Sequence, residues 1–257
     1  MIMQRIREAG AVVLLLAVSP VVVGFACPEQ RGARVLVFSK TAGYRHSSIG
    51  AGTAALQKMG RENGFEVDAT EDAGRFTAEG LRQYRAVVFL NTTGDVLDSA
   101  QQDAFERYVR AGGGYVGIHS ATDTEYDWPW YGKLAGAYFA GHPGNPNVRK
   151  GTFYTVDKRH PASEALPDRF ERTDEFYSFK QISPALHVLV KIDEASYGGG
   201  GNGENHPMAW YHAYDGGRAF YTAMGHTEES FAEPLFLAHL LGGVRYAMGS
   251  APAGASR

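Results

Sequence analysis

Strand and helix patterns alternate along residues 34–118, and this alternation constrains the fold more than any other feature of the sequence. Four short apolar, largely β-branched runs have the pattern of strands: 34–39, 65–69, 86–90 and 114–118. Three segments with helical spacing separate them: 49–63, 77–83 and 100–110. Each helix has to cross back over the sheet before the next strand begins. The pattern therefore predicts an α/β fold, with a mostly parallel sheet and helices on both of its faces.

The carboxyl edge of such a sheet is where function is expected, because loops that follow parallel strands meet there. Three loops fall on that edge: 39–49, 91–95 and 119–127. The third begins at a break in the strand, Gly117-Ile118-His119-Ser120-Ala121, where α/β enzymes often present a nucleophile on a strained elbow. Here the outer position of the elbow is a histidine.

The second half of the chain has a different texture, rich in aromatic residues, glycine and proline. Four further strands are predicted there: 148–156, 186–192, 208–214 and 218–223. Asp215-Gly216-Gly217 predicts a tight hairpin turn between the last two. Residues 231–246 are predicted to form a closing apolar helix, and Gly198 to Gly203 either a mobile lid or a disordered surface loop.

The ends of the chain are expected to lie outside the fold. Residues 1–26 combine Arg5 and Arg7 with an apolar stretch that ends in small residues, which predicts a signal peptide and export to the periplasm or the extracellular space. Residues 27–33 are a linker and 250–257 a disordered tail. Cys27 is the only cysteine, so an internal disulfide and a cysteine-rich zinc site are excluded, while lipid attachment at Cys27 is left open.

Composition limits the partners. The chain is 44% hydrophobic and 21% charged, which fits a soluble globular protein, and its formal net charge of -3 gives no basic footprint for nucleic acid. The apolar stretch contains Pro20 and is shorter than a spanning helix, so no integral membrane domain is expected. Self-association into a homo-oligomer is left open.

Several motifs together resemble the ThuA family, the trehalose-utilisation domain. They are "VFSKTAGYRHSSI" (37–49), "GGGYVGIHSATDT" (112–124), "GHP" (141–143), "DEFYSF" (174–179), "HPMAW" (206–210) and "MGHTEESF" (224–231). The resemblance implies one ThuA-like domain over 34–249, a flavodoxin-like fold similar to class I glutamine amidotransferases, and a link to sugar metabolism. In the amidotransferases a cysteine occupies the elbow. This chain has His119 there and keeps only the His226-x-Glu228 spacing, so it is not a cysteine glutaminase.

His119 is the first candidate for catalysis, because imidazole titrates near physiological pH and the elbow turns the side chain outward. Glu175 is expected to partner a histidine, with Asp174 structural, since neighbours in a strand face opposite sides. His226 and Glu228 complete the catalytic set. The alternatives are a buried structural His119, and Ser120 as a nucleophile with His226 as base, although Ser120 lacks the Gly-x-Ser-x-Gly setting.

Metal binding is an alternative role for the same histidines. His119, His142 and His226 could hold a divalent metal such as Zn²⁺, together with Glu175, although no HxH or HExxH spacing supports it. A carbohydrate is the expected small-molecule partner. The residues expected to contact it through hydroxyl donors, acceptors and aromatic faces are Tyr44, Arg45, His46, Ser120, Asp123, His142, Tyr177, His206 and Trp210.

Three hypotheses about function follow. The first is an exported enzyme that acts on a disaccharide or its keto derivative by histidine and carboxylate acid–base chemistry, as a hydrolase, lyase or isomerase. The second is a carbohydrate-binding domain without catalysis, and the third is a metal-dependent hydrolase that uses the same histidines. Metal content and product formation separate them.

Overall fold

The computed structural model describes residues 32–249 of the chain. The predicted signal peptide, Cys27 with the open question of lipid attachment, most of the linker and the tail 250–257 lie outside the described residues, and the expectations for them stay predictions. Within 32–249, no helix has both the length and the apolar character needed to cross a membrane.

A nine-stranded sheet forms the centre of the structure, in the order β2-β1-β3-β4-β11-β10-β9-β6-β7. Its first five strands are parallel neighbours: β2 (Phe65–Thr70), β1 (Ala33–Phe38), β3 (Ala86–Leu90), β4 (Gly114–Ile118) and β11 (Gly217–Thr222). Counted along the chain, this is the 2-1-3-4-5 order of flavodoxin-like sheets. Every residue of β3 and β4 is buried, as expected for parallel strands that are covered on both faces.

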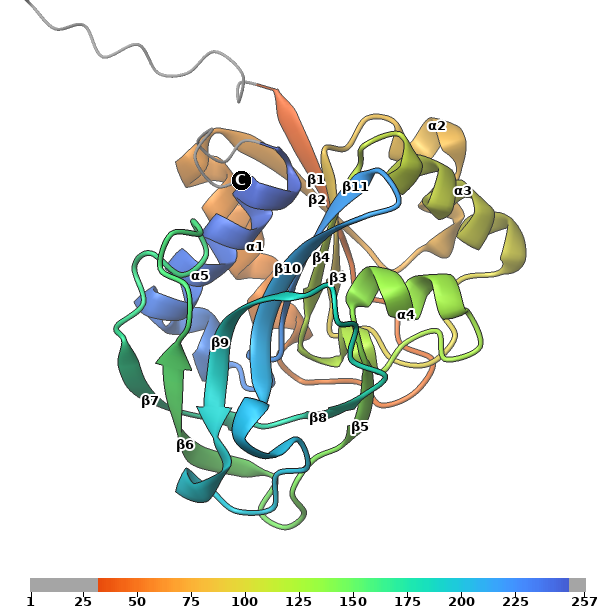
Figure 1. Ribbon diagram of the computed structural model, residues 1–257. Helices are drawn as coiled ribbons and strands as arrows, with labels where there is room; N and C mark the ends of the chain where they lie inside the picture. Colours follow the sequence, from red (N-terminus) through yellow and green to blue (C-terminus); the bar gives the residue numbers. More distant parts are fainter. Residues whose placement is uncertain (1–31, 250–257) are drawn as a thin grey trace, which may run out of the picture.

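Helices cover both faces of the parallel half (Figure 1). On one face lie α1 (Ile49–Asn63) and α5 (Pro234–Ala247); on the other lie α2 (Ala78–Leu81), α3 (Ser99–Arg110) and α4 (Pro129–Ala135). The predicted α/β class, with a mostly parallel central sheet between two helical layers, is therefore confirmed.

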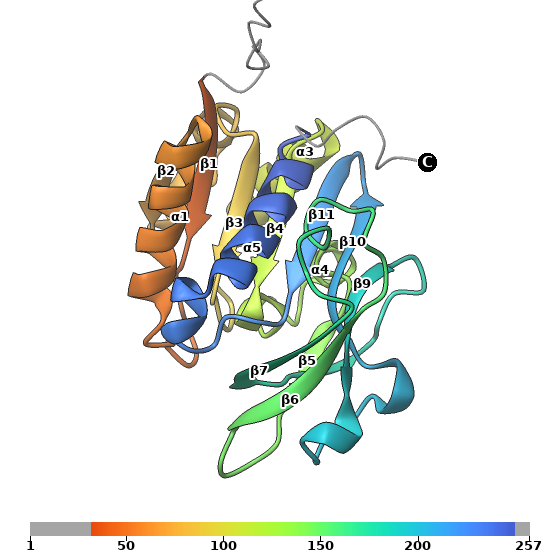
Figure 2. The ribbon, with the colours of Figure 1, turned by 90° about the vertical axis from the view of Figure 1, so that its left-hand side faces the viewer.

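The other four strands extend the sheet in antiparallel fashion (Figure 2). They are β10 (Pro207–Tyr214), β9 (His187–Asp193), β6 (Val148–Thr155) and β7 (Arg169–Glu175). A separate pair, β5 (Tyr138–Gly141) and β8 (Ser178–Lys180), lies beside this extension. Short 3-10 helices connect the elements at Ala73–Arg75, His119–Thr122, Glu194–Ser196, Gly203–Asn205 and Glu229–Ala232.

Local sequence signals predict most helices and strands in the first half of the chain correctly. The helix predicted at 49–63 and the strands at 86–90 and 114–118 are confirmed at both ends. Thr77 caps α2 by accepting from Gly80 N, and Asp98 caps α3 in a capping box with Gln101. The predicted hairpin turn is also confirmed, with positive φ at Asp215 (48°) and Gly216 (94°).

Four elements were not predicted: β5, β7, β8 and α4. The sequence of β7, RFERTDE, is charged at most positions: Arg169 and Glu171 are exposed on this edge strand, whereas the other charged residues are buried and belong to the site. β5 and β8 are only four and three residues long. The closing helix also begins later than predicted, since Pro234 starts α5 after a separate 3-10 turn.

The segment that follows β6 packs directly against α5. His239 of α5 donates from Nδ1 to Ala162 O at 2.6 Å, and His160 Nδ1 accepts from Ala162 N at 3.1 Å. A Cβ on Gly242 would lie only 2.1 Å from Pro161 O. Glycine is therefore required at this crossing. His239 bonds the helix to the loop, and His160 orders the loop itself.

We expect Gly242→Ala to destabilise the protein by about 2–4 kcal/mol, because the added methyl group overlaps a backbone carbonyl. The matched control is Gly50→Ala in α1, where a Cβ meets nothing within 4 Å and alanine is the better helix former by up to about 1 kcal/mol. Denaturant unfolding of both variants measures the difference. An equal effect at the two sites would contradict the packing argument.

Acid should weaken the fold through the same histidines. Burial lowers the pKa of His160 and of His239 to about 4, so both are neutral in the folded protein while the unfolded residues titrate near 6.5. Their stabilisation is complete above pH 6.5 and is lost as the pH falls towards 4, by up to about 3 kcal/mol for each. The free energy of unfolding, measured from pH 7.5 to 4.5, should show this fall. In His239→Gln it should fall less steeply with pH. A slope unchanged in that variant would refute the assignment.

Candidate functional site

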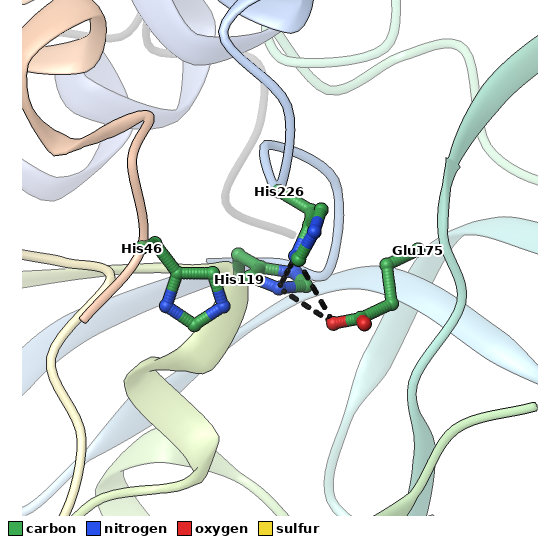
Figure 3. Close-up of side chains that lie close together, drawn as sticks. All are labelled: His46, His119, Glu175 and His226. Carbon is green, nitrogen blue, oxygen red and sulfur yellow. Dashed lines mark hydrogen bonds and ion pairs between the residues drawn. The ribbon is translucent and has the colours of Figure 1, made fainter. Parts of the chain in front are cut away.

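Four side chains from distant parts of the sequence meet at the carboxyl edge of the sheet (Figure 3). His46 follows β1, His119 follows β4, Glu175 ends β7 and His226 follows β11. Each contributes one possible metal-ligand atom, and these atoms all lie within 4.8 Å of one another. We call this set the donor cluster.

The elbow predicted at His119 is present. Its φ is 49°, a left-handed conformation that is uncommon and strained for a residue other than glycine. Two bonds hold it: Nδ1 donates to Ala223 O at 2.9 Å, and Tyr221 Oη donates to His119 O at 2.6 Å. The expectation that His119 points outward is wrong, because its side chain is fully buried against the ring of Tyr177. Its free Nε2 faces the rest of the donor cluster.

Three atoms of the donor cluster form a nearly equilateral triangle. His226 Nδ1 lies 3.1 Å from His119 Nε2 and 3.1 Å from Glu175 Oε2, and the latter two atoms are 3.3 Å apart. Since His119 Nδ1 donates to a carbonyl, a neutral His119 has only a lone pair on Nε2, which faces a carboxylate oxygen. The lone pair of His119 and the carboxylate oxygen of Glu175 repel each other unless a proton or a cation lies between them.

His46 completes the cluster in its neutral form. Burial and the neighbouring His119 and His226 lower the pKa of His46 to about 3. Its Nδ1 lies 3.3 Å from Ser120 Oγ, so the buried hydroxyl orients the imidazole ring. Ser120 contacts His46 rather than His226, which opposes the arrangement of a serine nucleophile with His226 as base.

Glu175 is ionised and carries the negative charge of the cluster. Burial disfavours its charged form, but the contacts with His119, His226 and Asn147 hold its pKa well below the ordinary range. The same pairing acts on His226: burial lowers its pKa, but the bond to Glu175 leaves it raised overall. Asn147 Nδ2 donates to Oε1, the carboxylate oxygen that faces away from the triangle.

A buried ion pair behind the cluster fixes the relative positions of β7 and the loop that follows β11. Asp174 accepts from Gly225 N at 2.9 Å and from the backbone N of His226 and Glu175 at 3.1 Å each. Arg172 donates to Asp174 at 2.9 Å, and both side chains are almost wholly buried. The expected division, Glu175 in the site and Asp174 outside it, matches this geometry.

Other predicted residues lie at the rim. Tyr44, 67% exposed, packs edge-on against His46, and His142 Nε2 lies 3.6 Å from Glu175 Oε1. Tyr177 lies under His119, with its ring 4.1 Å from that of Phe139. Asp123 accepts from Tyr126 Oη at 2.6 Å and is half-buried near the histidines, and burial raises its pKa.

Four predicted site residues do not reach the cluster. Glu228 is exposed and, within the described chain, its side chain makes no hydrogen bond or ion pair, because Glu175 takes the place beside His226. The guanidinium of Arg45 is engaged by Glu71. Trp210 is fully buried and donates to Ala135 O, so it belongs to the core.

The fourth, His206, is fully buried between Tyr177 O and Glu194 Oε1, both at 2.7 Å. The glycine loop beside it is anchored as well, since Glu194 also accepts from the backbone N of Asn202 and Gly203. His206 and this loop therefore support the backbone of Tyr177 instead of contacting a ligand.

The predicted metal set differs from the observed cluster in one member. The structure brings His119 and His226 together with His46, whereas the predicted His142 lies at the outer oxygen of Glu175. The signal for His46 was its position after the first strand of a parallel sheet, on the same edge as His119. Nothing in the sequence marks Asn147, which reaches Glu175 from a loop.

The comparisons with known proteins agree on one family. The family model "ThuA: Trehalose utilisation" matches residues 34–247. A ThuA-like protein from Bacteroides uniformis superposes with a TM-score of 0.71 at 23% identity, covering 85% of this chain and 92% of the other. One from Parabacteroides merdae has a TM-score of 0.68 at 18% identity, with 86% and 92% covered.

The same fold recurs inside a larger protein. A β-galactosidase from Bacillus circulans sp. alkalophilus superposes with a TM-score of 0.54 at 15% identity, over 86% of this chain and 32% of the other. At these identities the solved structures establish the shared fold alone. No curated protein matches the chain.

We expect Arg172→Met to lower the free energy of unfolding by about 3–5 kcal/mol, because Asp174 would remain buried without its partner. Arg169→Met on the same strand is the control, since that side chain is exposed and should change stability by less than about 0.5 kcal/mol. Chemical denaturation of both variants tests this. Equal losses would mean that the ion pair does not matter for the fold.

Proposed function

Because the chain belongs to the ThuA family, described as trehalose utilisation, we propose that it is a divalent-metal-dependent enzyme acting on a disaccharide or a keto-disaccharide. The family supplies the link to sugars. The donor cluster supplies the chemistry, and the observation that carries the proposal is its triangle of donor atoms, 3.1, 3.1 and 3.3 Å on a side.

These separations suit ligands that share one ion. Protein nitrogen and oxygen atoms bind zinc at about 2.0–2.2 Å, so two ligands of one ion lie about 3.0 Å apart at right angles and about 3.4 Å apart in a tetrahedron. Three histidines and one carboxylate favour Zn²⁺ or another first-row transition metal over Mg²⁺ and Ca²⁺, which prefer oxygen ligands.

The surroundings of the ligands support this role. His46 is neutral, as a nitrogen ligand must be. The other ring nitrogen of His119 donates a hydrogen bond to a backbone carbonyl, as in metal-binding histidines generally. Glu175 balances part of the charge of the ion. When bound, such an ion polarises a sugar oxygen and lowers the pKa of a coordinated water.

Outside the cluster, the exposed residues at the rim fit a polyhydroxylated ligand. His142 is 36% exposed and hydrogen-bonds through Nδ1 to Pro143 O, which leaves Nε2 directed to Glu175. Tyr44 offers an aromatic face beside His46. The proposal includes export of the chain, which the composition of residues 1–26 favours.

A metal-free enzyme is the second candidate, and one observation favours it. His226 Nδ1 lies 3.1 Å from Glu175 Oε2, and this contact raises the pKa of His226, so that the pair could transfer protons as acid and base. The same residues serve both functions, and only their dependence on metal differs.

The test is a metal analysis joined to a turnover assay on the full chain. We expect about one divalent ion per chain, and we expect product from trehalose, other disaccharides or their keto derivatives to disappear after chelation and to return with Zn²⁺, Co²⁺ or Mn²⁺. NMR time courses detect the product. Glu175→Gln and His226→Ala should weaken metal binding at least 100-fold, because each removes a ligand.

His187→Ala is the matched control, an exposed histidine of β9 outside the cluster, and should bind metal normally. Equal turnover with and without metal would replace the proposal by acid–base catalysis. Sugar binding without product under every condition would leave a carbohydrate-binding domain, and normal metal binding by both ligand variants would exclude the donor cluster as the site.

A further inference from the structure

A cavity lies at the opposite edge of the sheet from the donor cluster. It has a volume of about 390 Å³ and opens where β3 and β4 begin, among Arg85, Gly112 and Gly113. The five residues of β4 separate it from His119, a distance of about 17 Å along the strand. At this distance, a ligand in the cavity cannot contact the donor cluster.

Arginines dominate its polar lining. Arg82, Arg85, Arg107 and Arg218 all contribute to the wall, and among residues 32–249 no aspartate or glutamate does. The whole chain has a formal net charge of -3, so this group of arginines is not the result of a generally basic surface. Like charges gathered around one concavity repel one another, and a bound anion relieves that repulsion.

Most of these arginines lack a carboxylate partner. Arg82 pairs with Glu79 on the surface, but within residues 32–249 none of Arg85, Arg107 and Arg218 joins an ion pair. Arg218 donates only to the carbonyl of Tyr246. Three guanidinium groups therefore keep donors for a ligand, and their planar geometry suits two-point contact with carboxylate, sulfate or phosphate.

The rest of the wall is apolar. It is lined by small residues and by four buried side chains: Leu81, Tyr84, Tyr108 and Met248. The volume is in the range of small-molecule sites. A ligand that fits has an acidic group for the arginines and a ring or short chain to lie against the tyrosines.

We propose that this cavity is a binding site for a small organic anion that carries a carboxylate, sulfate or phosphate group, separate from the sugar-active centre. The test is calorimetric titration of the full chain, stripped of metal, with succinate, inorganic sulfate, inorganic phosphate and glucose 6-phosphate, and with glucose as the neutral control. The tetrahedral anions and succinate distinguish the type of acidic group.

We expect at least one anion to bind with a Kd of about 1 mM or tighter, glucose not to bind at this site, and added salt to weaken binding. The double variant Arg85→Gln/Arg107→Gln should lose at least tenfold in affinity. Arg61→Gln, an exposed arginine of α1 outside the cavity, and His119→Ala in the donor cluster should bind the anion normally.

Absence of binding by every anion would overturn the proposal, as would equal affinity of the double variant and the original chain. A loss in His119→Ala as large as that in the double variant would also overturn it, by assigning the anion to the donor cluster. Thermal unfolding of each variant confirms that it is folded, and failure of the metal proposal leaves these outcomes unaffected.

Discussion

The hydrogen bonds of Asp174 are the interaction on which the donor cluster depends. This single buried carboxylate accepts from the backbone of Gly225, His226 and Glu175, so it sets the distance between the edge strand β7 and the loop after β11. Arg172 neutralises it and also reaches Ser230 and Glu233 in the following segment. Glu175 on the edge strand and His226 in the loop after the central strand β11 are thereby held a hydrogen bond apart.

The donor cluster is held by rigid parts of the fold. His119 is fixed by a strained elbow and two hydrogen bonds. Ser120 orients His46 and Asn147 holds Glu175, so three buried polar groups converge with little freedom to move. Only His226 among the four is partly exposed, at 15% of its side chain. The cluster is therefore open to solvent on the side of His226, while Tyr177 covers the ring of His119.

The sequence predicts the parallel half of the fold well because its signals are local. Apolar runs such as Ala86–Leu90 and caps such as Asp98 act within a few residues, and they determine where an element begins and ends. Because the loops that follow parallel strands meet at the carboxyl edge of the sheet, His119 and His226 are then predicted to lie near one another. Residues whose place depends on tertiary contacts are missed: β7 carries a charged edge pattern, and Asn147 reaches Glu175 from a loop. Trp210 and His206 resemble ligand contacts by type, yet burial assigns them to the core.

The position of β11 has a consequence for how the chain is made. This strand lies between β4 and β10, yet it is the last of the eleven strands along the sequence. Until residues 217–222 have left the ribosome, the fully apolar β4 has an open edge, and the first four parallel strands have no connection to the antiparallel extension. Such an edge is a template for pairing between chains. Folding of this protein is therefore completed only near the end of synthesis, and its incomplete forms are the ones most exposed to aggregation.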